Sequence, residues 1–438
     1  MKQMKTFFTK TYGCQMNKYD TELISAIFIE NGYVETEKIE DADFVIINTC
    51  SVRERAKAKV YSEIARLSNI LRESDAKIGI CGCVAQQMGE DLIDKFSKVC
   101  FVIGTGGIYR LSEIINRIEY GERVVDVAFS KDNFEIHKFR RKPGVSAFVS
   151  IMKGCDNFCS YCIVPYVRGR EISRKPFEII DEIKYLRDLG YKEVTLLGQN
   201  VNSYGKNLDE SINFPKFLTM VNNIDGIERI RFVTSHPKDF SNDLINAMKE
   251  CEKVCEHVHL PLQSGSDRIL RKMNRKYILK KYMEIVEALK KNIDGIALTS
   301  DFIVGYPDES KEDFNNTLAA IKEIRYHTIF AFMYSPRPGT KAALANDNID
   351  KNEKRERLNE LITLQSEITY NINKSYEGKI TEVLIEGFSK KSRNIYMGRN
   401  RQNQIVNFVA QKQLEIGEMV KIKVIEGKKN TLFGELIN

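Results

Sequence analysis

The chain has 438 residues, of which 42% are hydrophobic and 29% are charged, and its formal net charge is +7. This length predicts two or three domains, and the composition is ordinary for a soluble globular protein. No run approaches the roughly 18 apolar residues of a membrane span, and the first residues lack the apolar stretch of a secretory signal. We therefore expect a cytoplasmic protein without membrane association, whose ten cysteines are reduced thiols or metal ligands rather than disulfides.

The first segment, to about residue 130, alternates short apolar runs with helical patterns. The apolar runs that predict buried strands are Phe7–Tyr12, Phe44–Ile47, Lys77–Ile80 and Phe101–Ile103. The stretches with apolar residues at helical spacing are Asp20–Glu30, Glu54–Leu71 and Gln86–Phe96. Strands that alternate with helices predict an α/β domain with a doubly wound parallel sheet.

Three cysteines of this segment follow predicted strands. They occur in Thr-Tyr-Gly-Cys14-Gln-Met-Asn, Ile-Asn-Thr-Cys50-Ser and Gly-Cys83-Val-Ala-Gln. Open parallel sheets bind ligands beyond the carboxyl ends of their strands, so we expect these cysteines to converge on one site. The alternative is three unrelated thiols, because buried free cysteine is common.

A cysteine triplet follows in the sequence Gly-Cys155-Asp-Asn-Phe-Cys159-Ser-Tyr-Cys162, with C-x3-C-x2-C spacing. Three thiolates can hold an iron–sulfur cube by three of its four irons, whereas electron-transfer clusters use four cysteines. An open iron can bind S-adenosylmethionine, and this is the spacing of the radical S-adenosylmethionine superfamily. A zinc site is the alternative, but zinc ribbons favour two C-x2-C pairs. Beside such a triplet, Cys14, Cys50 and Cys83 are a credible second cluster site.

The middle segment predicts a partial (β/α)6 barrel with the triplet on the loop after its first strand. The predicted strands are Ala147–Met152, Glu193–Leu197, Ile230–Thr234, His257–Leu262, Ala297–Val304 and Ile329–Tyr334. Catalytic groups of α/β barrels gather at the carboxyl ends of the strands. The residues that we expect at such positions to contact S-adenosylmethionine are Tyr161, Gly198, Gln199 and Asn200. For Tyr161 the alternative is an aromatic residue that packs on the barrel, and the alternating His257 and His259 are expected to be structural.

The C-terminal part predicts a charged helix and then a small β-barrel. We interpret the helix, from Asp350 to about Asn373, as a solvated linker. Five alternating runs predict strands of an oligonucleotide-binding type of barrel: Lys379–Ile385, Ile395–Met397, Ile405–Val409, Met419–Ile425 and Leu432–Ile437. From Lys374 onward the tail holds 12 Lys/Arg and 7 Glu, so it carries +5 of the net charge and favours a nucleic-acid partner.

Together these motifs resemble the tRNA methylthiotransferases, specifically the bacterial MiaB type, along essentially the whole chain. Beyond the N-terminal motifs and the triplet, the residues that carry the resemblance are Val-Pro-Tyr-Val-Arg168-Gly-Arg, Leu-Leu-Gly198-Gln-Asn-Val-Asn and His259-Leu-Pro-Leu-Gln-Ser-Gly-Ser. Gln15, Met16 and Asn17 favour the subgroup that acts on isopentenylated adenosine. The resemblance implies an N-terminal cluster domain over residues 1–130, a radical S-adenosylmethionine domain over 141–372 and a C-terminal TRAM domain over 373–438.

The resemblance also implies the activity and the ligands of the site. The expected substrate is isopentenylated adenosine beside the tRNA anticodon, methylthiolated at carbon 2 with two S-adenosylmethionine molecules. Cys155, Cys159 and Cys162 would bind the radical [4Fe–4S] cluster. Cys14, Cys50 and Cys83 would bind an auxiliary [4Fe–4S] cluster, although Cys81 lies close to Cys83. Cys100, Cys251 and Cys255 match no ligand position and are expected to be incidental thiols, although Cys251 and Cys255 could share a helix face.

The expected partners follow from the same resemblance. They are the anticodon stem-loop of tRNA and an electron donor such as flavodoxin or ferredoxin, and we expect a monomer. Lys390, Lys391 and Arg393 in a predicted turn are candidates for RNA contact. Three alternatives stay open: a methylthiotransferase for threonylcarbamoyl-adenosine, a non-catalytic cluster carrier, and an RNA-binding protein with structural zinc.

Overall fold

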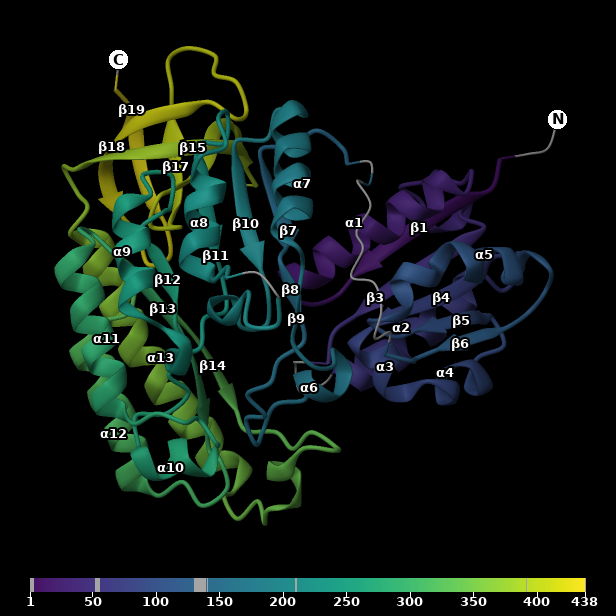
Figure 1. Cartoon of the computed structure of the whole chain (residues 1–438), viewed down its shortest axis with the longest axis horizontal. Helices are drawn as coiled ribbons and strands as arrows, with labels where there is room; N and C mark the ends of the chain where they lie inside the picture. Colours follow the sequence, from purple (N-terminus) through teal and green to yellow (C-terminus); the bar gives the residue numbers. More distant parts are fainter. Residues whose placement is uncertain are drawn as a thin grey trace. The chain divides into compact units, whose positions relative to one another are not determined.

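The computed structural model describes residues 4–51, 56–129, 139, 141–208, 211–390 and 392–437 (Figure 1). The chain divides into two compact units. The first unit comprises the chain up to Lys142, with Met152–Asp156 and Ile163–Arg174, and the second comprises Pro143–Ile151, Asn157–Cys162 and the chain from Lys175 onward. Of the helices in the described ranges, none has the length and apolar character needed to cross a membrane.

The first unit contains a six-stranded parallel sheet in the order β2-β1-β3-β4-β5-β6. Its strands are β1 (Thr6–Thr11), β2 (Val34–Glu35), β3 (Phe44–Thr49), β4 (Lys77–Gly82), β5 (Val99–Ile103) and β6 (Val124–Asp126). The helices around it are α1 (Gln15–Glu30), α2 (Ala56–Ile70), α3 (Cys83–Met88), α4 (Glu90–Lys95) and α5 (Leu111–Glu119), with 3-10 turns η1 (Ile39–Asp41) and η2 (Gly107–Arg110). The expected doubly wound sheet is confirmed. The sequence analysis missed the very short β2 and β6 and helix α5, and it predicted one helix over Gln86–Phe96 where the structure has α3 and α4.

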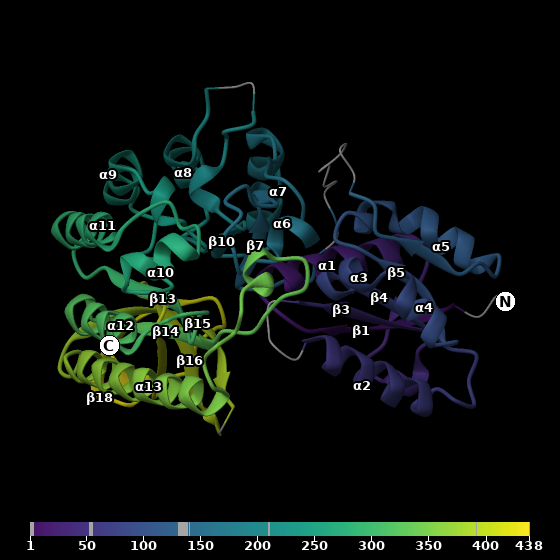
Figure 2. The ribbon, with the colours of Figure 1, turned by 90° about the horizontal axis from the view of Figure 1, so that it is seen from below.

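Helices cover both faces of this sheet, with α1 and α5 on one face and α2 on the other (Figure 2). Every residue of β3 and β5 is therefore buried, which explains why these strands read as continuous apolar runs. Apolar residues of α2, α3 and α4 pack with β3 and β4 in one core cluster. Each buried Val, Leu or Ile there contributes about 1.5–3 kcal/mol.

The second unit contains six parallel strands in two three-stranded sheets, β11-β10-β7 and β12-β13-β14. The strands are β7 (Ser146–Ser150), β10 (Glu193–Leu197), β11 (Arg229–Phe232), β12 (His257–His259), β13 (Ala297–Val304) and β14 (Thr328–Met333). The helices are α7 (Pro176–Asp188), α8 (Phe214–Asn222), α9 (Asn242–Glu250), α10 (Asp267–Lys272), α11 (Leu279–Asn292), α12 (Lys311–Ile324) and α13 (Lys351–Lys374), with 3-10 turns η3 (Val201–Ser203), η4 (Pro237–Asp239) and η5 (Lys341–Leu344). All six predicted barrel strands are present.

The long helix α13 corrects the interpretation of this stretch as a solvated linker. It packs on β14 and α12, and its buried residues include Leu361 and Ile368. Its buried polar residues have partners in the barrel: Gln365 donates from Nε2 to the carbonyl oxygen of Tyr326 at 2.7 Å. The sequence pattern does not predict this buried face, because hydrogen-bonded polar side chains occupy positions where apolar ones would be expected.

The expected C-terminal barrel is confirmed as a closed barrel in the order β15-β16-β17-β19-β18. Its strands are β15 (Ile380–Ser389), β16 (Ser392–Asn400), β17 (Ile405–Val409), β18 (Met419–Gly427) and β19 (Leu432–Leu436). Two buried arginines of β11 bind this C-terminal barrel, which belongs to the same second unit. Arg229 donates to the carbonyl oxygen of Arg399 at 2.7 Å and to Glu382 at 3.0 Å, and Arg231 donates to the carbonyl oxygen of Asn400 at 2.7 Å.

We predict that the ion pair between Arg357 of α13 and Glu309 holds this helix on the barrel. Its atoms are 2.7 Å apart and both side chains are buried. Arg357→Met should destabilise the second unit by about 3–5 kcal/mol, because Glu309 is left as an unpaired buried charge. The double variant with Glu309→Leu should recover most of that loss. Urea unfolding of the parent and the two variants measures this, and equal destabilisation by the single and double variants would contradict it.

Candidate functional site

The structure brings Cys14, Cys50 and Cys83 to the same edge of the first sheet. Cys14 follows β1 and is the N-cap of α1, Cys50 directly follows β3, and Cys83 begins α3 after β4. These strands are neighbours in the sheet and run parallel, so their carboxyl ends lie side by side. Cys14 is exposed, whereas Cys50 and Cys83 are buried.

Two glycines permit the close approach of these loops. Gly13 has a φ of +131°, and a Cβ atom on it would lie 2.4 Å from Cβ of Cys50. Gly82 has a φ of +92°, and its Cβ would lie 2.4 Å from the carbonyl oxygen of Thr49. Only glycine combines this backbone conformation with the absence of a side chain. Both glycines precede a cysteine directly, so they position the thiols.

The thiols of this cluster influence each other's protonation. A hydrogen bond with Cys50 lowers the pKa of Cys14 to about 6, and the Cys14 thiol lies 3.2 Å from Oδ1 of Asn17. Burial raises the pKa of Cys83, and the charge of Arg168 opposes that rise. Iron binds the thiolate form, so a low pKa favours metal binding at Cys14.

A buried ion pair lies beside these cysteines and was not foreseen from the sequence. Arg168 donates to Asp20 at 2.8 Å, and both side chains are almost fully buried. Asp20 belongs to α1, whose N-cap is Cys14, and Arg168 follows α6 (Val164–Val167). Val167 packs against Cys83. The segment after the triplet thus contributes to the first cysteine site.

The four cysteines outside the two predicted ligand sets are all buried. Cys81 lies inside β4, and burial raises its pKa far above the ordinary value of a thiol. Burial also raises the pKa of Cys100 to about 12. Cys251 is the C-cap of α9 and Cys255 lies beyond that helix, so the two do not share a helix face.

The cysteine triplet lies where the chain passes from one unit to the other. Cys155 follows β8 (Met152–Lys153), which pairs with β9 (Ile172–Ser173), and its N–H donates to the carbonyl oxygen of Gly169 at 3.2 Å. Cys159 and Cys162 belong to the second unit. The N–H of Cys162 donates to the carbonyl oxygen of Cys159 at 2.9 Å, in a tight turn.

Hydrogen bonds fasten this turn to the loop after α10. The N–H of Ser160 donates to the carbonyl oxygen of Met273 at 3.0 Å, and Asn274 donates to that of Phe158 at 2.9 Å. The Ser160 hydroxyl lies 2.9 Å from that of Tyr306. A turn held at both ends can present its thiols in one orientation.

Tyr161 is half-buried and packs against a barrel cluster that includes Ile269, Met273 and Tyr334. This contact supports the packing interpretation of Tyr161, and its role toward S-adenosylmethionine stays a prediction. Arg275 is a residue that the sequence did not single out. It donates to Sγ of Cys159 at 3.3 Å, although 115 residues of chain separate the two.

Gly198, Gln199 and Asn200 follow β10, as predicted, and Gly198 and Asn200 are buried. The Asn200 amide already has two partners: it donates to Asp239 at 2.9 Å and accepts from the N–H of His236 at 3.1 Å. These bonds give Asn200 a structural role between two loops. The contact of these three residues with S-adenosylmethionine stays a prediction.

One face of β12, β13 and β14 carries further candidates. Phe330 and Phe332 alternate along β14 and are 53% and 43% exposed. Phe330 pairs in register with Asp301, and its ring centroid lies 6.0 Å from that of His259. His259 lies 3.5 Å from Asp301 and 3.0 Å from the Thr299 hydroxyl, contacts that agree with its predicted structural role. Aromatic rings exposed beside polar groups are typical of a surface that stacks a nucleobase.

The predicted RNA-contacting residues lie at one end of the C-terminal barrel. Lys390 is exposed in the turn between β15 and β16, and Arg393 is exposed near the start of β16. Lys391 lies outside the described residues. The exposed lysines elsewhere on this barrel are Lys379, Lys412, Lys421, Lys423, Lys428 and Lys429. Lys428 forms an ion pair with Glu426, and Arg399 and Arg401 form ion pairs with Glu386 and Glu256.

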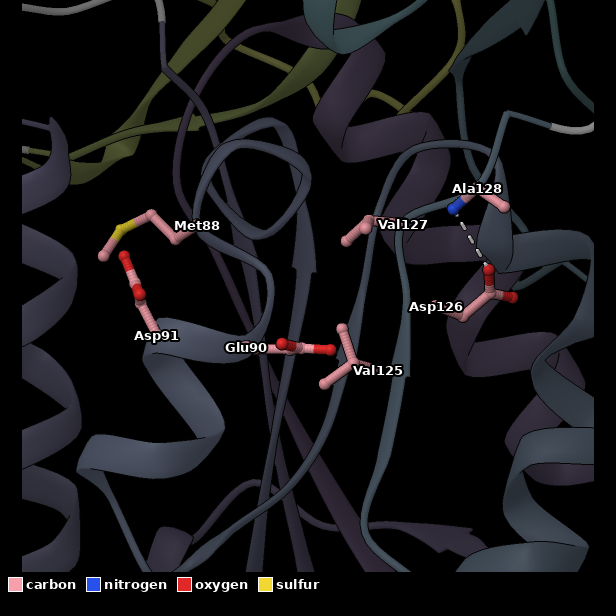
Figure 3. A pocket seen from close by; sticks show the side chains of 7 residues that line it. All are labelled: Met88, Glu90, Asp91, Val125, Asp126, Val127 and Ala128. Atoms are coloured by element: carbon pink, nitrogen blue, oxygen red, sulfur yellow. Dashed lines mark hydrogen bonds between the residues drawn. The ribbon is translucent and has the colours of Figure 1, made fainter.

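A groove of about 560 Å³ opens elsewhere on the first unit (Figure 3). Its lining residues come from α3, α4, β6 and the loop that follows β6, and its acidic members are Glu90, Asp91 and Asp126. None of the predicted site residues lines it. In the described parts of the chain, no three His, Cys, Asp or Glu side chains could hold one metal ion. A cubane cluster differs from such an ion because each cysteine binds a separate iron.

Comparison with protein families finds three matches along the chain. Residues 6–104 match the "Uncharacterized protein family UPF0004", residues 149–321 the "Radical SAM superfamily" and residues 374–437 the "TRAM domain". Among solved structures, the radical S-adenosylmethionine methyltransferase TsrM from Kitasatospora setae matches with a TM-score of 0.59 and 13% identity, over 78% of this chain and 74% of that one. The cobalamin-dependent enzyme OxsB matches with a TM-score of 0.54 and 11% identity, over 84% and 58% of the respective chains. These structures share the fold.

Curated relatives match the whole chain at higher identity. A tRNA-2-methylthio-N(6)-dimethylallyladenosine synthase of Clostridium botulinum is 47% identical over 98% of this chain and 97% of its own length. Synthases of the same name from Caldicellulosiruptor saccharolyticus and Clostridium novyi are 47% and 48% identical, each over 99% of this chain and over 93% and 97% of their own lengths. The chain therefore belongs to the family of tRNA-2-methylthio-N(6)-dimethylallyladenosine synthases, which are radical S-adenosylmethionine enzymes.

Proposed function

We propose that this enzyme methylthiolates carbon 2 of dimethylallyl (isopentenyl) adenosine beside the anticodon of tRNA. The observation that carries the proposal is the presence of two separate sets of three cysteines in a chain of this family. One set lies at the carboxyl edge of the first sheet, and the other lies on the loop after the first barrel strand. The names of the relatives favour this substrate over threonylcarbamoyl-adenosine.

We propose that Cys155, Cys159 and Cys162 hold one [4Fe–4S] cluster, and that Cys14, Cys50 and Cys83 hold a second. The first site suits a cluster because it has three thiols and no fourth cysteine in its loop, which leaves one iron for S-adenosylmethionine. The second suits one because its thiols meet at one sheet edge and Cys14 has a low pKa. When bound, these groups supply a carbon-centred radical and the sulfur, which an unactivated purine carbon requires.

The side chains of the protein then bind the tRNA and orient the adenosine. The exposed rings of Phe330 and Phe332 can stack the adenine once it leaves the anticodon loop, where unstacking is cheaper than in a duplex. Exposed lysines of the C-terminal barrel can approach phosphates without reading sequence. We propose domains over 1–130, 141–372 and 373–438, and a cytoplasmic monomer that receives electrons from a donor such as flavodoxin or ferredoxin.

Expression in a host that lacks its own enzyme tests the proposed function. The full chain should restore methylthiolated dimethylallyladenosine in tRNA, as nucleoside analysis by mass spectrometry detects. The variant with Ala at Cys155, Cys159 and Cys162 should restore none. Reconstituted anaerobically, the parent should bind about eight irons and this variant about half. Unchanged iron in the variant would contradict the assignment of the triplet.

A second experiment distinguishes Cys83 from Cys81. Cys83→Ala should still produce 5′-deoxyadenosine but lose the methylthiolated product by at least about tenfold, because only the second site is damaged. Cys81→Ala should keep most of its activity, because its thiol lies inside β4. Cys100→Ala, another buried thiol of the same sheet, is the matched control. Loss of product with Cys81→Ala alone would show that the ligand is Cys81.

A third experiment examines the basic turn of the C-terminal barrel. Charge reversal of Lys390 and Arg393 to Glu should weaken tRNA binding on the order of tenfold and make its salt dependence shallower, by about 0.7–0.9 for each lost phosphate contact. Reversal of Lys280 and Lys281 on α11 changes the net charge equally and should have a smaller effect. Fluorescence anisotropy at several salt concentrations measures both. Equal effects of the two double variants would assign the loss to net charge alone.

A further inference from the structure

In the part of the chain that the structure describes, the charge on Arg275 has no carboxylate partner, although its side chain is buried. Arg275 is 4% exposed and follows α10. Among the described residues, no Asp or Glu lies within ion-pair distance of it. Two other buried arginines do have such a partner: Arg168 binds Asp20 at 2.8 Å, and Arg231 binds Glu193 at 2.8 Å. A buried cation without a counter-ion costs several kcal/mol, so its presence points to an anion.

The groups that contact Arg275 indicate which anion could balance its charge. Its Nε donates to the Tyr277 hydroxyl at 2.9 Å, and Nη2 donates to the carbonyl oxygen of Pro261 at 2.8 Å. Its Nη1 donates to Sγ of Cys159 at 3.3 Å and to the Tyr161 hydroxyl at 3.4 Å. Phenols are neutral near pH 7, because their ordinary pKa is about 10. Cys159 is the neighbour that becomes an anion when it binds iron.

We propose that Arg275 is a positioning residue of the triplet site, whose buried charge compensates the negative charge of the iron–sulfur cluster and fixes the Cys159 thiolate. This inference rests on the proposed function. Three thiolates outweigh the two positive charges of an oxidised cube, so the site as a whole is anionic. An arginine keeps its charge at any relevant pH, and its planar fork contacts the sulfur and two hydroxyls together.

The proposal predicts the direction of a change in reduction potential. Reduction adds a negative charge to the cluster, and a nearby cation stabilises that charge in a site of low dielectric constant. Arg275→Met should therefore make reduction harder. At fixed potential the ratio of reduced to oxidised cluster should fall by at least about tenfold, which is about 59 mV for one electron. Arg275→Lys keeps the charge and should recover part of this ratio.

The experiment uses the full chain with Ala at Cys14, Cys50 and Cys83, so that the triplet cluster alone is observed. Paramagnetic resonance during a dithionite titration reports the potential of this parent and of its Arg275→Met and Arg275→Lys variants. The matched control is Arg231→Met, which removes an equally buried arginine that has its own carboxylate. It should leave the cluster potential unchanged.

The outcomes distinguish a role for the charge of Arg275 from a role for the shape of its side chain. A negative shift in the Met variant that Lys partly reverses supports the proposal, as does loss of iron from the Met variant but not from the Lys variant. Equal potentials in the parent and Met variant overturn it, and so do equal shifts or equal iron losses in the Met and Lys variants. A parent that binds no iron would instead contradict the triplet assignment in the proposed function.

Discussion

Parallel strands that end at a common edge are the constraint on which the rest of this protein depends. In the first unit, β1, β3 and β4 are neighbours, and each is followed within a few residues by a cysteine. No long-range contact of the thiols themselves is needed to assemble this site, because backbone pairing of the strands does it. Gly13 and Gly82 then remove the side chains that would keep the loops apart.

Buried charge divides into two kinds in this structure. Arg357 and Arg231 pair with carboxylates and bind pieces of the second unit together: α13 to the barrel, and the C-terminal barrel to β11. Such ion pairs add little net stability, but breaking one is costly, so they favour one arrangement of the packed elements. Arg275 has no carboxylate partner among the described residues and contacts a cysteine thiol instead. This contact is the basis of the role proposed for Arg275 at the triplet site.

In the basic C-terminal barrel, residues that pack in the core alternate along β18 with basic residues at the surface. Side chains such as Val420, Ile422 and Val424 of β18 fill the barrel interior, and the alternating Lys421 and Lys423 face solvent. This alternation follows from the two-residue period of a strand. The strand that helps to close the barrel therefore also presents positive charge on its outer face.

The sequence alone determined the two cysteine sets, the parallel sheet, the six barrel strands and the C-terminal barrel, because strand alternation and motif spacing are local properties of the chain. It also determined the basic tail. Only the tertiary structure decided that α13 packs on the barrel, that Asn200 is bound to Asp239 and His236, and that Phe330 and Phe332 are exposed. It alone placed Arg275 on Cys159. These contacts join residues far apart in the chain through polar groups, and no periodic pattern records which distant partner satisfies a buried polar group.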